Sequence, residues 1–156
     1  MTTTITGATG IDNIQAATGA VLQVVVAETT TQTVHNSTSF VATAITASIT
    51  PSSTSSKILV SVTSNIESNG AGEKAIYSIY RSTTPIAFGH TLQPTGASGS
   101  IIFPIALQKL DSPSTASAVT YTLYIKRTTA TIVANLNSTG DGRTQTGTIT
   151  LMEIAG

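Results

Sequence analysis

The strongest constraint on the fold is a sustained alternation of apolar and polar residues with a period of two. From Ile58 to Ile66 the even positions are mostly apolar and the odd positions more polar, and from Val119 to Lys126 the odd positions are apolar. Successive side chains of a β-strand point to opposite faces, so each segment predicts a strand with one face in a core.

Other segments add strands with less regular patterns. The runs 21–28 and 101–108 are almost continuously apolar and rich in β-branched residues, which is typical of strands buried on both faces. Pro104 places the second run at a sheet edge or a bulge, because proline cannot donate to a ladder. Five further candidate strands are the segments 40–45, 74–81, 86–90, 131–136 and 144–154.

Turn-forming sequences separate these segments. They include Thr50-Pro51, Asn69-Gly70, Asp111-Ser112-Pro113 and Gly140-Asp141-Gly142, and no window shows a helical period of 3.6. Many short strands without helices to support parallel crossovers predict an all-β fold. We therefore expect an antiparallel β-sandwich, jelly-roll-like, with about nine strands.

The first twenty residues lack this alternation. They hold the scattered apolar residues Ile5, Ile11 and Ile14 among Thr, Gly and Ala. We predict an extended N-terminal arm over 1–20 that docks on a partner through these isoleucines, followed by a head domain over 21–156. The alternative is a loosely ordered tail, as many termini are. The sequence shows neither the pattern of a signal peptide nor that of a membrane span, so we expect synthesis in the cytoplasm and no membrane partner.

Ionisable side chains are scarce. Only 9% of residues are charged, against roughly 25% in ordinary soluble domains. Seven acidic and seven basic residues give zero net charge, so we expect no nucleic-acid partner. Acid–base, phosphate and metal chemistry need such groups gathered at one place, and the chain has no Cys. The composition therefore predicts a non-catalytic protein without a metal or cofactor.

The potential metal ligands and catalytic acids are isolated in the sequence. His35 and His90 are the only two imidazoles and have no ligand partners at metal-binding spacing, so we expect both at the surface or in turns. Glu67 and Glu73 flank one turn, where a solvated loop is the expected setting.

The tyrosines form two pairs, each on one predicted strand. Tyr77 and Tyr80 lie on opposite faces, as do Tyr121 and Tyr124, so one of each pair should face the core. We expect Tyr80 and Tyr124 to be the outward ones, available for stacking on a sugar or for a subunit contact. The alternative is that they simply cover the sheet.

Four segments carry a resemblance to a known family. They are residues 18–25 (TGAVLQVV), residues 48–60 (SITPSSTSSKILV), Asp111-Ser112-Pro113 ahead of VTYTL at 119–123, and residues 148–156 (TITLMEIAG). This succession resembles the β-rich module of virion proteins of marine and cyanobacterial tailed phages, often found at the C-terminal end of tail fibres. The resemblance implies a virion structural protein, assembled as a homotrimer, with no catalytic residues.

The short segment before the module favours one role over the others. With only an arm ahead of the head, the chain fits a capsid decoration, knob or head-fibre protein that binds the major capsid protein. The alternative is a short tail-fibre or fibre-tip protein that binds a tail protein and host-surface glycans. A third hypothesis, an enzyme acting on such glycans, requires two carboxylates close together in a cleft.

Overall fold

The computed structural model describes residues 17–68, 70–96, 99, 101–128, 134–136 and 145–156, which form ten strands and no helix. No helical segment of membrane-spanning length and hydropathy occurs in those residues. The strands are β1 (Val21–Thr29), β2 (Thr33–His35), β3 (Val41–Ile49), β4 (Lys57–Ser68), β5 (Lys74–Arg81), β6 (Thr84–Leu92), β7 (Ile101–Asp111), β8 (Val119–Arg127), β9 (Ala134–Leu136) and β10 (Gly147–Ile154).

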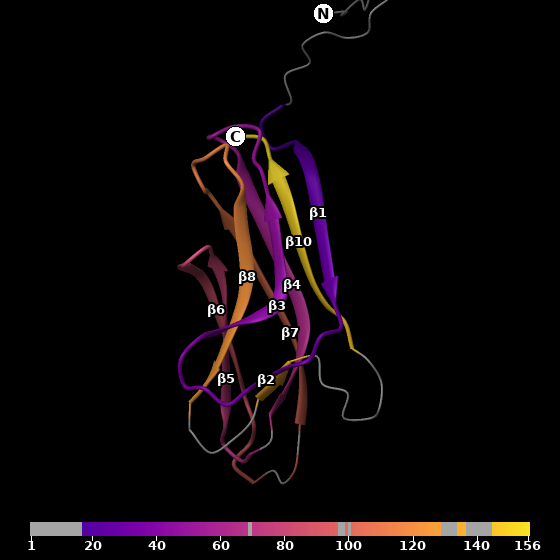
Figure 1. The fold of residues 1–156 in the computed structure, drawn as a ribbon, viewed down its shortest axis with the longest axis vertical. Coiled ribbons are helices and arrows are strands. Elements are labelled where there is room, and N and C mark those ends of the chain that lie inside the picture. Colours follow the sequence, from indigo (N-terminus) through magenta and orange to yellow (C-terminus); the bar gives the residue numbers. More distant parts are fainter. Residues whose placement is uncertain (1–16, 69, 97–98, 100, 129–133, 137–144) are drawn as a thin grey trace, which may run out of the picture.

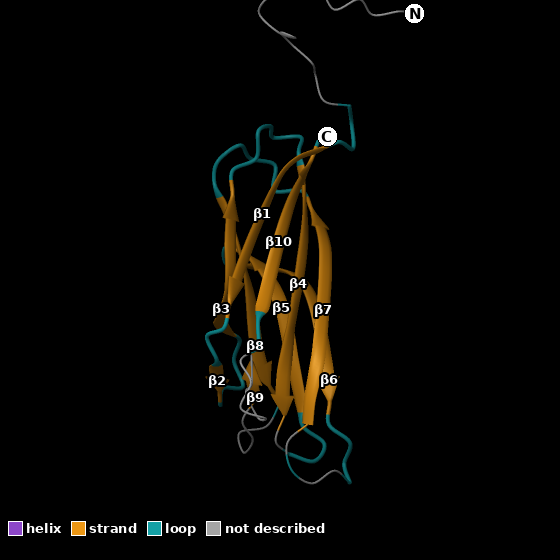
Figure 2. Ribbon diagram, turned by 90° about the vertical axis from the view of Figure 1, so that its right-hand side faces the viewer, coloured by secondary structure: helices purple, strands orange, loops and turns teal. Residues whose placement is uncertain are grey.

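The strands form two antiparallel sheets packed face to face (Figures 1 and 2). Sheet A has the long strands β1, β10, β4 and β7 in that order, and the short strands β9 and β2 extend it beside the end of β4. Sheet B has the order β3, β8, β5 and β6. The predicted all-β sandwich is confirmed.

The long strands pair in a nested order. The first, β1, pairs with the last, β10; β3 pairs with β8; β4 pairs with β7; and β5 pairs with β6. Two further pairings, β10 with β4 and β5 with β8, join these pairs into two sheets of four long strands each. A long hairpin rolled up in this way is a jelly roll, as the sequence predicts.

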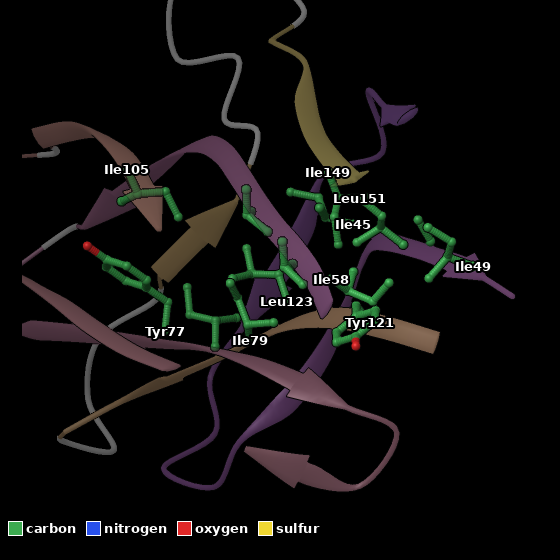
Figure 3. Packing of buried hydrophobic residues seen from close by; sticks show 14 of the residues in the cluster. Ile45, Ile49, Ile58, Tyr77, Ile79, Ile105, Tyr121, Leu123, Ile149 and Leu151 are labelled. Carbon is green, nitrogen blue, oxygen red and sulfur yellow. The ribbon is translucent and has the colours of Figure 1, made fainter. Parts of the chain in front are cut away.

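The core lies between the sheets and follows the alternation in the sequence. In β4 the even positions from Ile58 to Ile66 face inward, and in β8 the odd positions from Val119 to Ile125 do so. Figure 3 shows Ile58, Leu123 and Ile149 among the side chains packed in this layer. The apolar positions that define the strands are thus the ones that hold the sheets together.

Two strands depart from their expected burial. Val24 and Val26 of β1 are 51% and 56% exposed and Ile102 of β7 is 38% exposed, so the prediction that both strands are buried on both faces is wrong for the single chain. The reason is that these side chains point to the outer face of sheet A, which no described part of the chain covers. The edge position predicted from Pro104 is confirmed, since β7 pairs with β4 alone within the described residues.

Some local predictions also need correction. Glu73 and His35 are 1% and 4% exposed, not solvated. Glu73 accepts a hydrogen bond from the Thr128 amide at 2.9 Å, and His35 belongs to β2, a strand that the sequence did not predict. Residues 131–133 and 144 of two predicted strands lie outside the described residues.

Gly19 and Ala20, just before β1, lie beside the C-terminus at one end of the sandwich. The Gly19 amide donates to Ala155 O and the Ala155 amide to Ala20 O, both at 2.8 Å, which continues the β1–β10 ladder beyond the strands (Figure 1). Ile5, Ile11 and Ile14 lie outside the described residues. The predicted arm therefore joins the head beside the C-terminus.

Candidate functional site on the outer face of sheet B

Four aromatic side chains gather on the outer face of sheet B, and we call them the aromatic cluster. They are Tyr80 of β5, Phe88 of β6, Tyr124 of β8 and Phe40, which immediately precedes β3. The strand register explains this, because Ser78 lies opposite both Tyr124 and Phe88 and its small side chain leaves room between them.

The rings contact one another closely. Tyr80 and Tyr124 stack with centroids 4.0 Å apart and planes 27° apart, and Phe40 meets the Tyr80 ring at 5.8 Å and the Phe88 ring at 6.0 Å. Such offset and edge contacts are favourable geometries for aromatic pairs. Phe88 remains 59% exposed, whereas Ser78 beneath the cluster is fully buried. The cluster is therefore a pre-formed surface with one open ring.

Basic side chains border the aromatic cluster. The Lys126 ammonium lies 4.7 Å from the centroid of the Phe40 ring, a cation–π contact. Lys126, Ile76 and His90 lie side by side across β8, β5 and β6, and Lys74 is two residues before Ile76 on the same face. A shallow hollow of about 240 Å³ lies here, lined by Lys74, Ile76, Phe88, Gly89 and His90.

The strands of sheet B contain no acidic residue. Asp and Glu are absent from β3, β5, β6 and β8, which carry Lys74, Arg81, His90, Lys126 and Arg127. Arg81 pairs with Asp111 of sheet A at 3.1 Å and Arg127 is buried. The remaining basic residues, Lys74 and Lys126, give this face a positive character that the zero net charge of the chain conceals.

The aromatic cluster joins predicted residues with residues that the sequence did not single out. Tyr77 and Tyr121 face the core and Tyr80 and Tyr124 face outward, as expected. Phe40, Phe88 and Lys126 were missed. The alternation within the predicted strand 86–90 places Phe88 on the same face as His90, so its outward direction could have been predicted. Its contacts with rings on other strands could not, because they depend on the strand register, which the sequence does not show.

The inward face of this region explains a glycine in β6. Gly89 lies opposite Tyr77, and a Cβ atom built there would come within 2.3 Å of the Tyr77 ring. Only glycine leaves room for the ring to lie against the β6 backbone. The strand that presents Phe88 outward is thus packed tightly from behind.

A second apolar surface lies on the opposite side of the molecule. Val24, Met152, Leu59 and Leu110 are directly opposite one another across β1, β10, β4 and β7, so they form one line across sheet A, which we call the apolar row. Val24 and Leu110, at its two ends, are 51% and 49% exposed.

The buried ionisable groups serve the fold. Asp111 binds Arg81 and the Tyr121 hydroxyl, and Glu153 binds Gln23 and Ser52. Burial lowers the pKa of His35. Within the described residues, no three His, Cys, Asp or Glu side chains gather in a way that could hold a metal ion.

Comparison with known proteins adds no relative. No family model matches the chain, and no curated protein matches it either.

Proposed function

We propose that the protein is a non-catalytic structural component of a tailed-phage virion. In this role it is a homotrimeric capsid decoration protein, of the cement, knob or head-fibre type, anchored to the major capsid protein by its N-terminal arm. The observation that carries the proposal is the apolar row, a line of large apolar side chains across the four long strands of sheet A that is exposed at both ends.

The apolar row suits contact with a second copy of the chain. Contiguous exposed apolar side chains on a soluble domain mark interaction sites. On one side the row is followed by the neutral hydroxyl residues Thr150 and Ser61, and on the other side Lys57 lies beside it. An identical face can therefore approach the row itself without placing a charge in it. Contact there would also cover the outward faces of β1 and β7, whose nearly continuous apolar sequences are otherwise unexplained.

The position of the apolar row also suits an anchored assembly. Leu22 and Ile154 continue the apolar surface from the row toward the end where Gly19 and Ala20 pair with Ala155. Copies joined through the row would gather their arms at that end. Several weak arm contacts on one lattice then bind far more tightly than one, because the later contacts become intramolecular.

Replacing Val24 with Asp is expected to dissociate the assembly, because the substitution buries an unpaired charge within the contact. Light scattering after gel filtration should change from the mass of three chains to that of one chain, 15.9 kDa. Val34→Asp is the matched control, since Val34 is 61% exposed on β2, away from the apolar row. A wild-type protein that is already monomeric at about 10 μM would contradict the self-contact.

The role on the particle is tested by counting and by deletion. Quantitative mass spectrometry of purified particles should find this chain in a ratio to the major capsid protein that matches lattice decoration. A head lacking residues 2–16 should keep its fold but fail to rebind stripped particles. Rebinding by the truncated head would refute the arm as anchor, and a ratio lower by an order of magnitude would favour a tail position.

The aromatic cluster favours a second candidate, a short tail-fibre or fibre-tip protein that binds host-surface glycans. Aromatic rings pre-arranged on a sheet, with Phe88 open to solvent, offer the flat apolar surface on which a sugar stacks. This candidate shares the virion setting and the homotrimer with the first and differs in what the outer face of sheet B contacts.

A further inference from the structure

The aromatic cluster and the lysines beside it form one continuous surface with two kinds of chemistry. Phe88 lies in the wall of the hollow, and the ammonium and imidazole groups of Lys74 and His90 line the same hollow. Small-molecule sites commonly combine apolar walls with a few polar groups that fix the ligand's orientation. We infer that this surface binds a carboxylate-bearing saccharide, stacked on Phe88 and paired with Lys74 and Lys126.

The apolar half of the site is held rigidly. Phe88 contacts the Phe40 ring, Phe40 contacts Tyr80, and Tyr80 stacks on Tyr124, so the exposed Phe88 ring lies at the end of a chain of ring contacts. A ring fixed before binding loses little conformational entropy when a sugar stacks on it. The flat exposed face of Phe88 therefore favours a pyranose ring over a flexible ligand.

The charged half of the site explains why the saccharide should be acidic. Lys74 and Lys126 have no carboxylate partner among the described residues, and the four strands of sheet B contain no Asp or Glu. Glu73, the neighbour of Lys74 in sequence, is buried and accepts a hydrogen bond from Thr128. An anionic ligand on this face gains attraction without local repulsion.

The small number of cations separates a saccharide from nucleic acid. Binding to a phosphate backbone draws on many lysines and arginines, whereas this face offers one lysine in the hollow, Lys74, and a second, Lys126, beside it. Isolated carboxylates on a sugar chain match this sparse arrangement. The inference rests on the proposed exposure of the head at the particle surface, in either the capsid or the tail position.

The test is titration calorimetry of the full-length protein with two acidic probes and their neutral counterparts. Oligogalacturonate is compared with its methyl ester, and sialyllactose with lactose. At least one acidic probe should bind, and its neutral counterpart should bind about tenfold more weakly or not at all. Equal affinity for both members of each pair, or no heat with any probe at about 10 mM, would overturn the inference.

Variants locate the binding. Phe88→Ala and the double variant Lys74→Met/Lys126→Met should each weaken binding about tenfold, because they remove the stacking ring and the cations separately. Lys57→Met, which removes a lysine from sheet A, should bind as the wild type does. If Phe88→Ala or the double lysine variant binds with unchanged affinity and unchanged circular dichroism, the assigned site is wrong.

A failure of the saccharide site can be distinguished from a failure of the proposed virion role. A protein that is abundant in particles but binds none of the probes refutes only the saccharide site. A protein that binds a probe but is missing from purified particles refutes only the virion proposal.

Discussion

Asp111→Ala is expected to lower the free energy of unfolding by about 3 kcal/mol, the largest loss from a single substitution that we predict. The Asp111 carboxylate accepts hydrogen bonds from Arg81 Nη1 at 3.1 Å and from the Tyr121 hydroxyl at 2.7 Å. Because Asp111 ends β7 of sheet A while Arg81 and Tyr121 belong to sheet B, the carboxylate ties the two layers together. Urea unfolding at one fixed protein concentration measures the loss.

The magnitude follows from what the substitution leaves behind. Tyr121 is fully buried, and burial together with its bond to Asp111 raises the pKa of its hydroxyl, which is therefore a neutral donor. An unpartnered buried donor costs about 1–3 kcal/mol, and the broken ion pair adds to this. The Arg81 side chain is 29% exposed and still donates to Ser112 O, which keeps the total below that for a fully buried pair.

Two variants separate these contributions. Tyr121→Phe keeps the ring and removes only the hydroxyl, so it should cost about 1 kcal/mol. Asp111→Asn keeps an acceptor of the same shape and should fall between the two. An Asp111→Ala protein within about 0.5 kcal/mol of the wild type would show that the tie between the sheets contributes nothing measurable.

The fold was predictable because local pattern and long-range packing agree in this chain. The alternation in β4 and β8 reflects their central positions in the two sheets, each with one face in the core. The pattern failed at β1 and β7, where apolar residues face solvent on the outer side of an edge strand. The sequence pattern shows that a side chain is apolar, but it does not show whether anything covers that side chain, so an exposed apolar face has the same pattern as a buried one.

The candidate site was predictable only in part for a related reason. The outward direction of Tyr80 and Tyr124 follows from parity within each strand, but their stacking depends on the β5–β8 register. Phe40 and Phe88 are far apart in sequence and meet only because β3, which Phe40 precedes, and β6 belong to the same sheet. The sequence of one strand does not show which strand it pairs with. The positive character of sheet B was hidden in the same way, because the pairing of the strands, and not the composition, brings together four segments without an acidic residue.

Acid is expected to destabilise the head through Glu153, and this is the second large effect. Glu153 Oε1 accepts hydrogen bonds from the Ser52 amide at 2.7 Å and the Ser52 hydroxyl at 2.6 Å, and Oε2 accepts one from Gln23 Nε2 at 2.6 Å. Gln23 also donates to Thr50 O at 2.7 Å. The carboxylate thus joins β1, β10 and the β3–β4 loop at the end of the sandwich where Gly19 pairs with Ala155.

The direction of the pH dependence follows from the pKa of Glu153. Burial alone would raise this pKa, but the hydrogen bonds from Ser52 and Gln23 outweigh it and hold the pKa at about 2. A carboxyl with a lower pKa in the folded state stabilises the fold above its unfolded pKa of about 4.3 and loses that contribution as the pH falls toward 2. We expect roughly 2–3 kcal/mol of stability to disappear between pH 5 and pH 2.

Chemical denaturation of Glu153→Gln across this pH range provides the decisive comparison. The amide keeps the size of the side chain but cannot ionise, so the variant should be less stable than the wild type at pH 7 by roughly 2 kcal/mol, with the difference shrinking steadily toward pH 2. Glu28→Gln, an exposed carboxyl on the neighbouring strand β1, should leave the wild-type profile unchanged. The expectation is contradicted if the difference in free energy of unfolding between the wild type and Glu153→Gln stays constant from pH 7 to pH 2. The Ser52 and Gln23 contacts would then not favour the ionised carboxylate. In that case the acid sensitivity of the head must arise from another carboxyl.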